Sequence, residues 1–179
     1  MAETHDHGAV WIQSDLLPGG TYVATLHADD DNSRVLDRDT ALRYAAAVHQ
    51  AATQAEHDAA VVAQLRASGL SREEAALTLV DLRADRAPLD PQVTAPLVFK
   101  PCVSANRGVG YLELSVGDRP LGQWDADAAH AHAGHVMAVV AAVDLDAAYR
   151  RFLIGTVGLD ATHAEDIVGD LAEHIQAAQ

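Results

Sequence analysis

Residues 37–66 read DRDTALRYAAAVHQAATQAEHDAAVVAQLR, and residues 125–154 read DADAAHAHAGHVMAVVAAVDLDAAYRRFLI. Each stretch begins with two closely spaced aspartates, and the first has neither glycine nor proline from Thr40 to Arg66. An aspartate at the start of a helix accepts hydrogen bonds from the exposed N–H groups of the first turn. The two stretches therefore predict two long helices. Their likeness to each other also indicates an internal repeat.

The repeat extends beyond the long helices. Residues 37–68 align with residues 125–156, and residues 69–86 align with residues 158–175 after a shift of one position. The alignment contains 14 identities in 50 pairs, and nine of these are not alanine, the residue that an Ala-rich chain matches by chance. We therefore predict a tandem duplication that organises the whole fold.

Local signals mark one buried face and the helix ends. In the first half, apolar residues recur at spacings of three and four, which predicts one apolar stripe. Gly69 ends the long helix, and Ser71 with Glu74 matches the capping box of a short second helix. Gly158 and Asp160 give the corresponding stop and start in the second half. The stripe consists of Ala41, Ala45, Val48, Ala52, Ala55, Ala59 and Val62.

Strand-like segments precede each long helix. One begins at Ala9 and ends at the Pro-Gly-Gly turn of residues 18–20, and residues 21–27 return from it. In the second half, residues 97–99 start a strand and residues 110–116 return. An isolated hairpin is only marginally stable, so we expect the two hairpins to join in one small sheet covered by the long helices.

These elements predict an α+β, mostly helical fold. The unit of β-hairpin, long helix and short helix occurs twice and packs with pseudo-twofold symmetry. Residues 1–86 form the first repeat, residues 87–96 a Pro-rich linker, and residues 97–179 the second repeat. Each repeat has few large apolar residues, so the two should form one compact globular unit.

Composition limits the classes of function. The formal net charge is −14, which disfavours binding to nucleic acid and leaves an acidic nucleic-acid mimic as a remote alternative. Cys102 is the only cysteine, so no intrachain disulfide forms. No uninterrupted apolar run approaches 18 residues, and we expect a cytoplasmic protein that does not bind membranes. One lysine against 11 arginines suggests a GC-rich bacterial source.

The densest group of chemically active side chains is Asp127, His130, His132 and His135. Imidazole and carboxylate groups spaced three apart on a helix suit divalent metals. However, His130 and His132 point about 200° apart on a regular helix, so the three histidines cannot bind one ion together. We therefore expect packing or solvated histidines, with no metal and no cofactor.

Aspartates also recur at equivalent positions of the two halves. Asp58 and Asp146 lie in the long helices, and Asp81 and Asp170 lie in the short ones. A shared scaffold explains such residues more simply than two active sites do. We expect Asp58 and Asp146 to mark a helix bend, and Asp81 and Asp170 to pair with an arginine or a helix N-terminus.

Four residues are candidates for contact with a partner or ligand: Trp11, Trp124, Arg150 and Arg151. The tryptophans should pack hairpins onto helices, and an exposed one would instead mark a contact surface. The arginines could grip an anionic group, although a surface ion pair with Asp144 or Asp146 is the expected alternative.

No catalytic constellation is legible, whereas a duplication builds a broad paired surface. We therefore expect a non-catalytic binding or assembly protein. It would hold a protein partner, a small ligand or a second copy of itself on a pseudo-symmetric surface or in a cleft between the repeats. The rival hypothesis is a metal-dependent or acid–base enzyme around residues 127–135. The metal content of the purified protein distinguishes the two.

Overall fold

The protein is a mostly helical α+β chain in a computed structural model that describes residues 10–29, 32–87, 90–104 and 106–176. The predicted fold class is confirmed to that extent. Pro88 of the predicted linker and Ala9 lie outside the described residues. In chain order, the elements are β1 (Trp11–Leu17), β2 (Thr21–His27), β3 (Ser33–Leu36), α1 (Arg38–Ala67), α2 (Arg72–Ala84), α3 (Pro91–Thr94), β4 (Leu97–Val103), β5 (Gly110–Val116), β6 (Arg119–Asp125), α4 (Ala126–Phe152), the π-helix η1 (Leu153–Val157) and α5 (Ala161–Gln176).

The predicted hairpins are present, but each has a third antiparallel strand. β1, β2 and β3 form one sheet, and β4, β5 and β6 form a second, so the prediction of a single joined sheet is wrong. Each hairpin gains its stability from its own third strand instead. In the first sheet Ala24 pairs with Leu36, and in the second Leu112 pairs with Trp124.

The helix ends follow the local chemistry of the sequence. The Asp37 and Asp125 carboxylates each accept a hydrogen bond of 2.7 Å, from the N–H of Thr40 and of Ala128 respectively. α1 is a single helix of 30 residues. The predicted capping box of α2 is present in both directions, and Gly69 adopts a φ of +99° that other residues rarely take.

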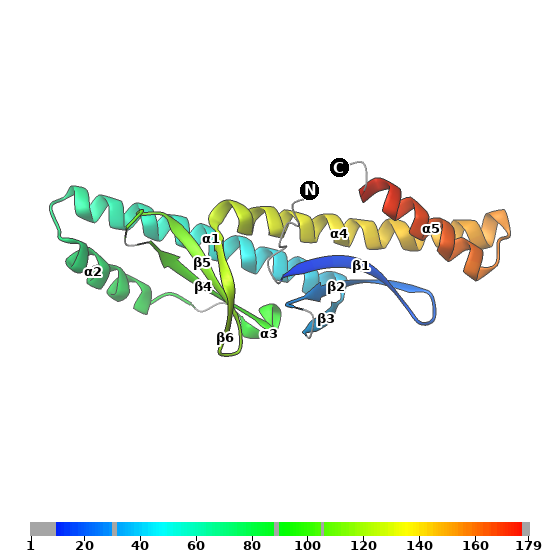
Figure 1. Cartoon of the computed structure of the whole chain (residues 1–179), viewed down its shortest axis with the longest axis horizontal. Helices are drawn as coiled ribbons and strands as arrows, with labels where there is room; N and C mark the ends of the chain where they lie inside the picture. The colour runs from blue at the N-terminus through cyan, green and yellow to red at the C-terminus, as the bar shows by residue number, and fades with distance from the viewer. Residues whose placement is uncertain (1–9, 30–31, 88–89, 105, 177–179) are drawn as a thin grey trace, which may run out of the picture.

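The two halves exchange their packing partners. α1 packs on β4 and β5, α4 packs on β1 and β2, and the two long helices lie antiparallel against each other (Figure 1). At Gly110, the start of β5 approaches the backbone of α1 so closely that a Cβ atom would collide with the Ala55 carbonyl group. Each sheet therefore covers the long helix of the other half.

One hydrophobic cluster spans both halves. All residues of the predicted α1 stripe are buried except Val62, which is half-buried. The fully buried large side chains of the cluster include Leu26 and Leu36 from the first sheet and Leu97 and Leu112 from the second. The core is therefore shared, and neither half encloses a complete core of its own.

The long helices continue past this core in opposite directions, which makes the molecule elongated (Figure 1). One end is a helical pair formed by the last part of α1 and α2. The other end, which we call the α4–α5 arm, comprises residues 145–176. Among the described residues, the buried apolar residues outside the shared core are Ala59 in α1, Ala75 and Leu79 in α2, and Ala164 and Val168 in α5.

α4 is more apolar than its packing requires. Residues Ala126–Val157 are long and apolar enough to cross a membrane, judged by length and composition alone, with a mean hydropathy of 1.2 in the relevant window. Only 28% of that window is buried. Core packing therefore accounts for only part of the apolar character of this helix.

Candidate functional site

The predicted histidine segment lies in the first three turns of α4. Asp127 and His135 are exposed there, whereas His130 and His132 meet α1 at different points. Among the residues that the structure describes, no three His, Cys, Asp or Glu side chains are placed to hold a metal ion. The segment is therefore split between two separate contacts with α1.

His132 lies at the crossing of the long helices. Its Nε2 atom shares a hydrogen bond of 3.1 Å with the hydroxyl of Tyr44, a fully buried side chain. The Trp124 ring lies 4.7 Å from the imidazole, centroid to centroid. Burial, with a smaller contribution from the nearby His135, lowers the pKa of His132 from 6.5 to about 4. His132 is therefore neutral at pH 7 and packs the crossing.

This burial predicts a specific loss of stability in acid. Below pH 6.5 the unfolded chain gains a proton at His132 that the folded chain does not accept until about pH 4. The free energy of unfolding should fall across that interval by roughly 3 kcal/mol from this residue. Chemical denaturation at several pH values should show a smaller loss in His132→Phe, and an unchanged loss in the control His57→Gln, whose side chain is exposed on α1. Identical profiles for wild type and His132→Phe would contradict this account.

His130 belongs to a chain of polar side chains that the sequence did not reveal. Its Nδ1 atom lies 2.7 Å from Nδ1 of His49, and its Nε2 atom lies 3.3 Å from a carboxylate oxygen of Glu56. His49 and Glu56 come from α1, 81 and 74 residues away in the chain. The result is a carboxylate–imidazole–imidazole chain that can pass a proton toward solvent at His49, which is exposed.

The recurring aspartates have structural partners, but not the expected ones. Asp58 is 1% exposed and accepts hydrogen bonds from Arg83 at 2.9 Å and from Arg86 at 2.6 and 2.8 Å. Asp146 accepts one from the Ser14 hydroxyl at 3.0 Å. α1 continues through Asp58 as one helix, and arginines from the segment that follows it hold the carboxylate. Among the described residues, the expected pairing of Asp81 and Asp170 with an arginine is not found.

The two arginines near the end of α4 differ in their surroundings. Arg150 donates hydrogen bonds of 2.6 and 2.9 Å to Glu165 of α5. The expected pair with Asp144 or Asp146 is therefore wrong. Arg151 is exposed. Arg150 thus links α5 to α4, whereas Arg151 has no ion-pair partner among the described residues.

Both tryptophans are half-buried. Trp11 stacks on His27 with ring centroids 4.6 Å apart and planes within 5° of parallel. Trp124 packs between Phe99 and His132. Both rings therefore contribute to packing, and each keeps an edge toward solvent.

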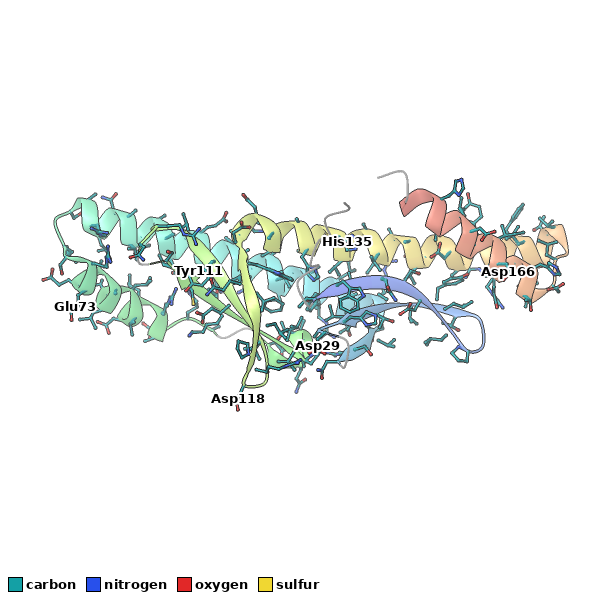
Figure 2. The ribbon with its side chains drawn as sticks, viewed as in Figure 1. Asp29, Glu73, Tyr111, Asp118, His135 and Asp166 are labelled. Atoms are coloured by element: carbon teal, nitrogen blue, oxygen red, sulfur yellow. The ribbon has the colours of Figure 1, made fainter. Side chains whose placement is uncertain are left out.

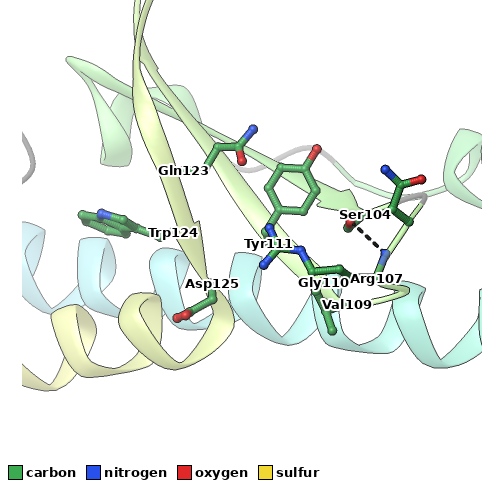
Figure 3. A pocket seen from close by; sticks show the side chains of 9 residues that line it. Ser104, Arg107, Val109, Gly110, Tyr111, Gln123, Trp124 and Asp125 are labelled. Atoms are coloured by element: carbon green, nitrogen blue, oxygen red, sulfur yellow. Dashed lines mark hydrogen bonds between the residues drawn. The ribbon is translucent and has the colours of Figure 1, made fainter.

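Trp124 also lines an open polar cavity of about 350 Å³ beside the β4–β5 loop (Figure 3). Tyr111, Gln123 and Asp125 form its wall, and Arg107 reaches over it from the loop, where its N–H donates a hydrogen bond of 3.2 Å to Ser104. These groups are mixed in charge and largely exposed. They form a solvated depression and define no single ligand chemistry.

A second cavity, of about 300 Å³, lies between the two halves. Leu36 lines it from the first half, and Val140 and Val143 line it from α4. An ion pair between Arg38 and Asp144 lies at its rim, with both side chains more than half exposed. This cavity is lined by residues of both halves, the place where the sequence predicts a cleft. Its size is at the lower limit for a small-molecule site.

Exposed apolar side chains occur on α2, at Leu77, Val80 and Leu82, and on both helices of the α4–α5 arm. Leu145, Tyr149 and Phe152 occupy positions i, i+4 and i+7 of α4, so they share one face of the helix. Their exposed fractions are 51%, 43% and 53%. On α5, Ile167 and Leu171 are 46% and 41% exposed and also share a face. Side chains of this size rarely gather on a surface that faces only water.

The corresponding face of α1 is more polar, although the counterpart of Tyr149 is the apolar, half-buried Val61. The sequence alignment pairs Leu145 with His57 and Phe152 with Gln64, and both α1 residues are exposed. Likewise, Ala138 and Ala141 of α4 correspond to Gln50 and Thr53 of α1. A long helix of this fold therefore does not need an apolar outer face. Sequence periodicity could have revealed the contrast, but only once the buried faces were known.

Comparison of the chain with protein-family models, curated proteins and solved structures finds no match.

Proposed function

We propose that this protein is a non-catalytic binding or assembly protein that holds a protein partner on its α4–α5 arm. The observation that carries the proposal is the exposed apolar face at Leu145, Tyr149 and Phe152. Aromatic and large aliphatic side chains dominate the energetics of protein interfaces when they are buried by a partner.

The proposal depends on a comparison of α4 with α1, and two observations support the internal duplication that this comparison assumes. The strand pair Ala24–Leu36 recurs 88 residues later as Leu112–Trp124, the offset that also aligns the long helices. Tyr44 and His132, again 88 residues apart, touch each other. In a twofold arrangement, equivalent residues meet at the axis. We infer that the two halves are related by an approximate twofold axis near this pair.

Within such a scaffold, α1 acts as an internal control for α4. The α1 helix folds with polar residues, His57 and Gln64, at the counterparts of Leu145 and Phe152, so we infer that these two apolar residues of α4 are not needed for folding. Exchange of Leu145 and Phe152 for their α1 counterparts, Leu145→His with Phe152→Gln, should leave the free energy of unfolding within about 0.5 kcal/mol. The same exchange should release the protein from its complex in cell extract.

Gel filtration of extract from cells that make the protein naturally checks this prediction. Wild type should elute in a complex larger than its own 18.9 kDa, and the exchanged variant should elute as the free protein. The matched control places the apolar residues on the other helix, as His57→Leu with Gln64→Phe, and should leave the complex intact. If the variant remains in the complex, the arm is not the binding surface.

A second candidate function rests on the Glu56–His130–His49 chain, which has the form of an acid–base relay. An enzyme that uses this chain, with or without a metal, remains the rival proposal. Stoichiometric zinc, iron or manganese in protein purified without a histidine tag, lost in His130→Ala, would favour the enzyme.

A further inference from the structure

We propose that the partner held by the α4–α5 arm is an amphipathic helix with a basic polar face. This inference rests on the proposed function and adds the chemistry of the partner. An unbroken seam of exposed residues at spacings of three and four runs along the outer face of α4, as in helix pairs. It spans 19 residues, with a rise of about 27 Å along the helix. The seam consists of Gly134, Ala138, Ala141, Leu145, Tyr149 and Phe152.

The size of the side chains changes along the seam. Its first half is small, with Gly134 and Ala138, so the backbone of a partner helix can come close. Its second half is large, with Leu145 and Phe152, which offer apolar area to bury. A straight helix of about 18 residues matches this length. Because the seam lies on one helix and runs along it, it fits a helical partner better than a globular one.

The charge near the large end of the seam is negative. Asp166 and Asp170 are exposed on α5, beside Ile167 and Leu171 in sequence, and Asp166 lies at the end of the molecule opposite Glu73 (Figure 2). In the described part of the chain, neither aspartate forms an ion pair with an arginine or lysine. The exposed Arg151 is one position from Phe152, just as Asp166 is one position from Ile167. However, residues 145–176 contain six Asp and Glu against two Arg, so the arm is acidic overall. A partner with lysine or arginine beside its apolar stripe therefore complements this surface.

The same charge argues against two other occupants. Two copies of this chain would each bring a net charge of −14, and their mutual repulsion opposes association. An anionic membrane surface would repel the arm for the same reason. A basic helix is instead attracted by the negative charge of the protein.

Two synthetic 18-residue peptides test the inference with the full-length protein. Both peptides place leucine at the same spacings of three and four residues, so that one face of the helix is apolar. The remaining positions are lysine in the first peptide (Leu/Lys) and glutamate in the second (Leu/Glu). We expect fluorescence anisotropy to show binding of the Leu/Lys peptide and none of the Leu/Glu peptide. Leu145→His with Phe152→Gln should weaken binding of the Leu/Lys peptide by at least about tenfold. Asp166→Asn with Asp170→Asn should weaken it and reduce its dependence on salt.

The α1 variant His57→Ala with Gln64→Ala is the matched control and should bind the Leu/Lys peptide as wild type does. Equal binding to wild type and to the Leu145→His, Phe152→Gln variant would mean attraction to the acidic protein in general, and would overturn the inference. Binding of the Leu/Glu peptide alone would also overturn it. So would a wild-type dimer in sedimentation equilibrium that dissociates in this variant, because a second copy would then be the occupant.

The proposed function can survive the failure of this inference. If the exchanged variant leaves its complex in cell extract but the Leu/Lys peptide does not bind, the arm holds a partner of another kind. If the variant stays in its complex, the proposed function fails whatever the peptides do.

Discussion

A chain that ends at Arg86 should not fold. In that chain, β1 and β2 lose α4, the helix on which they pack, and α1 loses β4 and β5. Large parts of the shared core are then exposed to water, and a small domain has little stability to spare. Thermal denaturation followed by circular dichroism should show no cooperative transition.

Residues 87–179, produced separately, provide the control. Each fragment alone should lack a melting transition, and an equimolar mixture should regain one, because each half supplies the cover for the other sheet. A sharp two-state melt of residues 1–86 alone would contradict the exchanged packing.

Asp58→Ala should produce the largest effect of a single substitution. The carboxylate is buried and accepts hydrogen bonds from Arg83 and Arg86, whose side chains are 29% and 26% exposed. Burial alone would raise the pKa of Asp58, but the hydrogen bonds from Arg86 and Arg83 outweigh it and lower the pKa. Removal of the carboxylate leaves two partly buried cations without a partner, which costs about 3 kcal/mol. Urea denaturation at pH 7 measures this loss.

Asp146, at the equivalent position of α4, is the matched control. Burial raises the pKa of Asp146, and the Ser14 hydroxyl offsets this only in part. Its charged form therefore contributes little or negative stability at pH 7, and Asp146→Ala should cost much less than Asp58→Ala. Equal losses would mean that the arginine pairs of Asp58 do not stabilise the fold. Because the pKa of Asp58 is lowered on folding, its contribution should disappear only in strong acid, below the ordinary pKa of an aspartate.

Local chemistry explains which parts of the fold could be predicted from the sequence. Asp37 and Asp125 cap helices, and Ser71 with Glu74 closes a capping box, because these bonds join residues three apart in the chain. Gly69 ends α1 because it adopts a backbone conformation that other residues avoid. Each of these features is decided within one turn of the chain.

The missed features depend on distant residues. β3 has only four residues, and β6 contains Pro120 and Gly122, which normally interrupt strands. Both strands form because they pair with an existing hairpin, and the local sequence of β3 or β6 does not predict this pairing. The packing of each sheet on the long helix of the other half likewise depends on tertiary contacts. Local sequence cannot predict it, because either long helix offers a suitable apolar face.

In the candidate sites, too, local sequence predicts some features, and others depend on distant residues. Helical geometry predicts that His130 and His132 point apart, but both side chains contact α1, and helical geometry cannot reveal that His49 and Glu56 meet His130 there. Arg150 lies one turn from Asp146 and should pair with it by sequence, yet the α5 helix brings Glu165 closer. The apolar face of the arm was missed because an apolar helix face normally predicts burial in the core.

Site-specific photo-crosslinking in cells that make the protein is the most direct test of the proposed binding surface. A photoreactive phenylalanine replaces Phe152 in one protein and its α1 counterpart, Gln64, in another. Both side chains are exposed, so the two probes differ mainly in the helix that carries them. We predict one discrete crosslinked protein from position 152 and none from position 64. No crosslink at position 152, or the same products from both positions, would contradict the assignment of the α4–α5 arm as the surface that holds a partner.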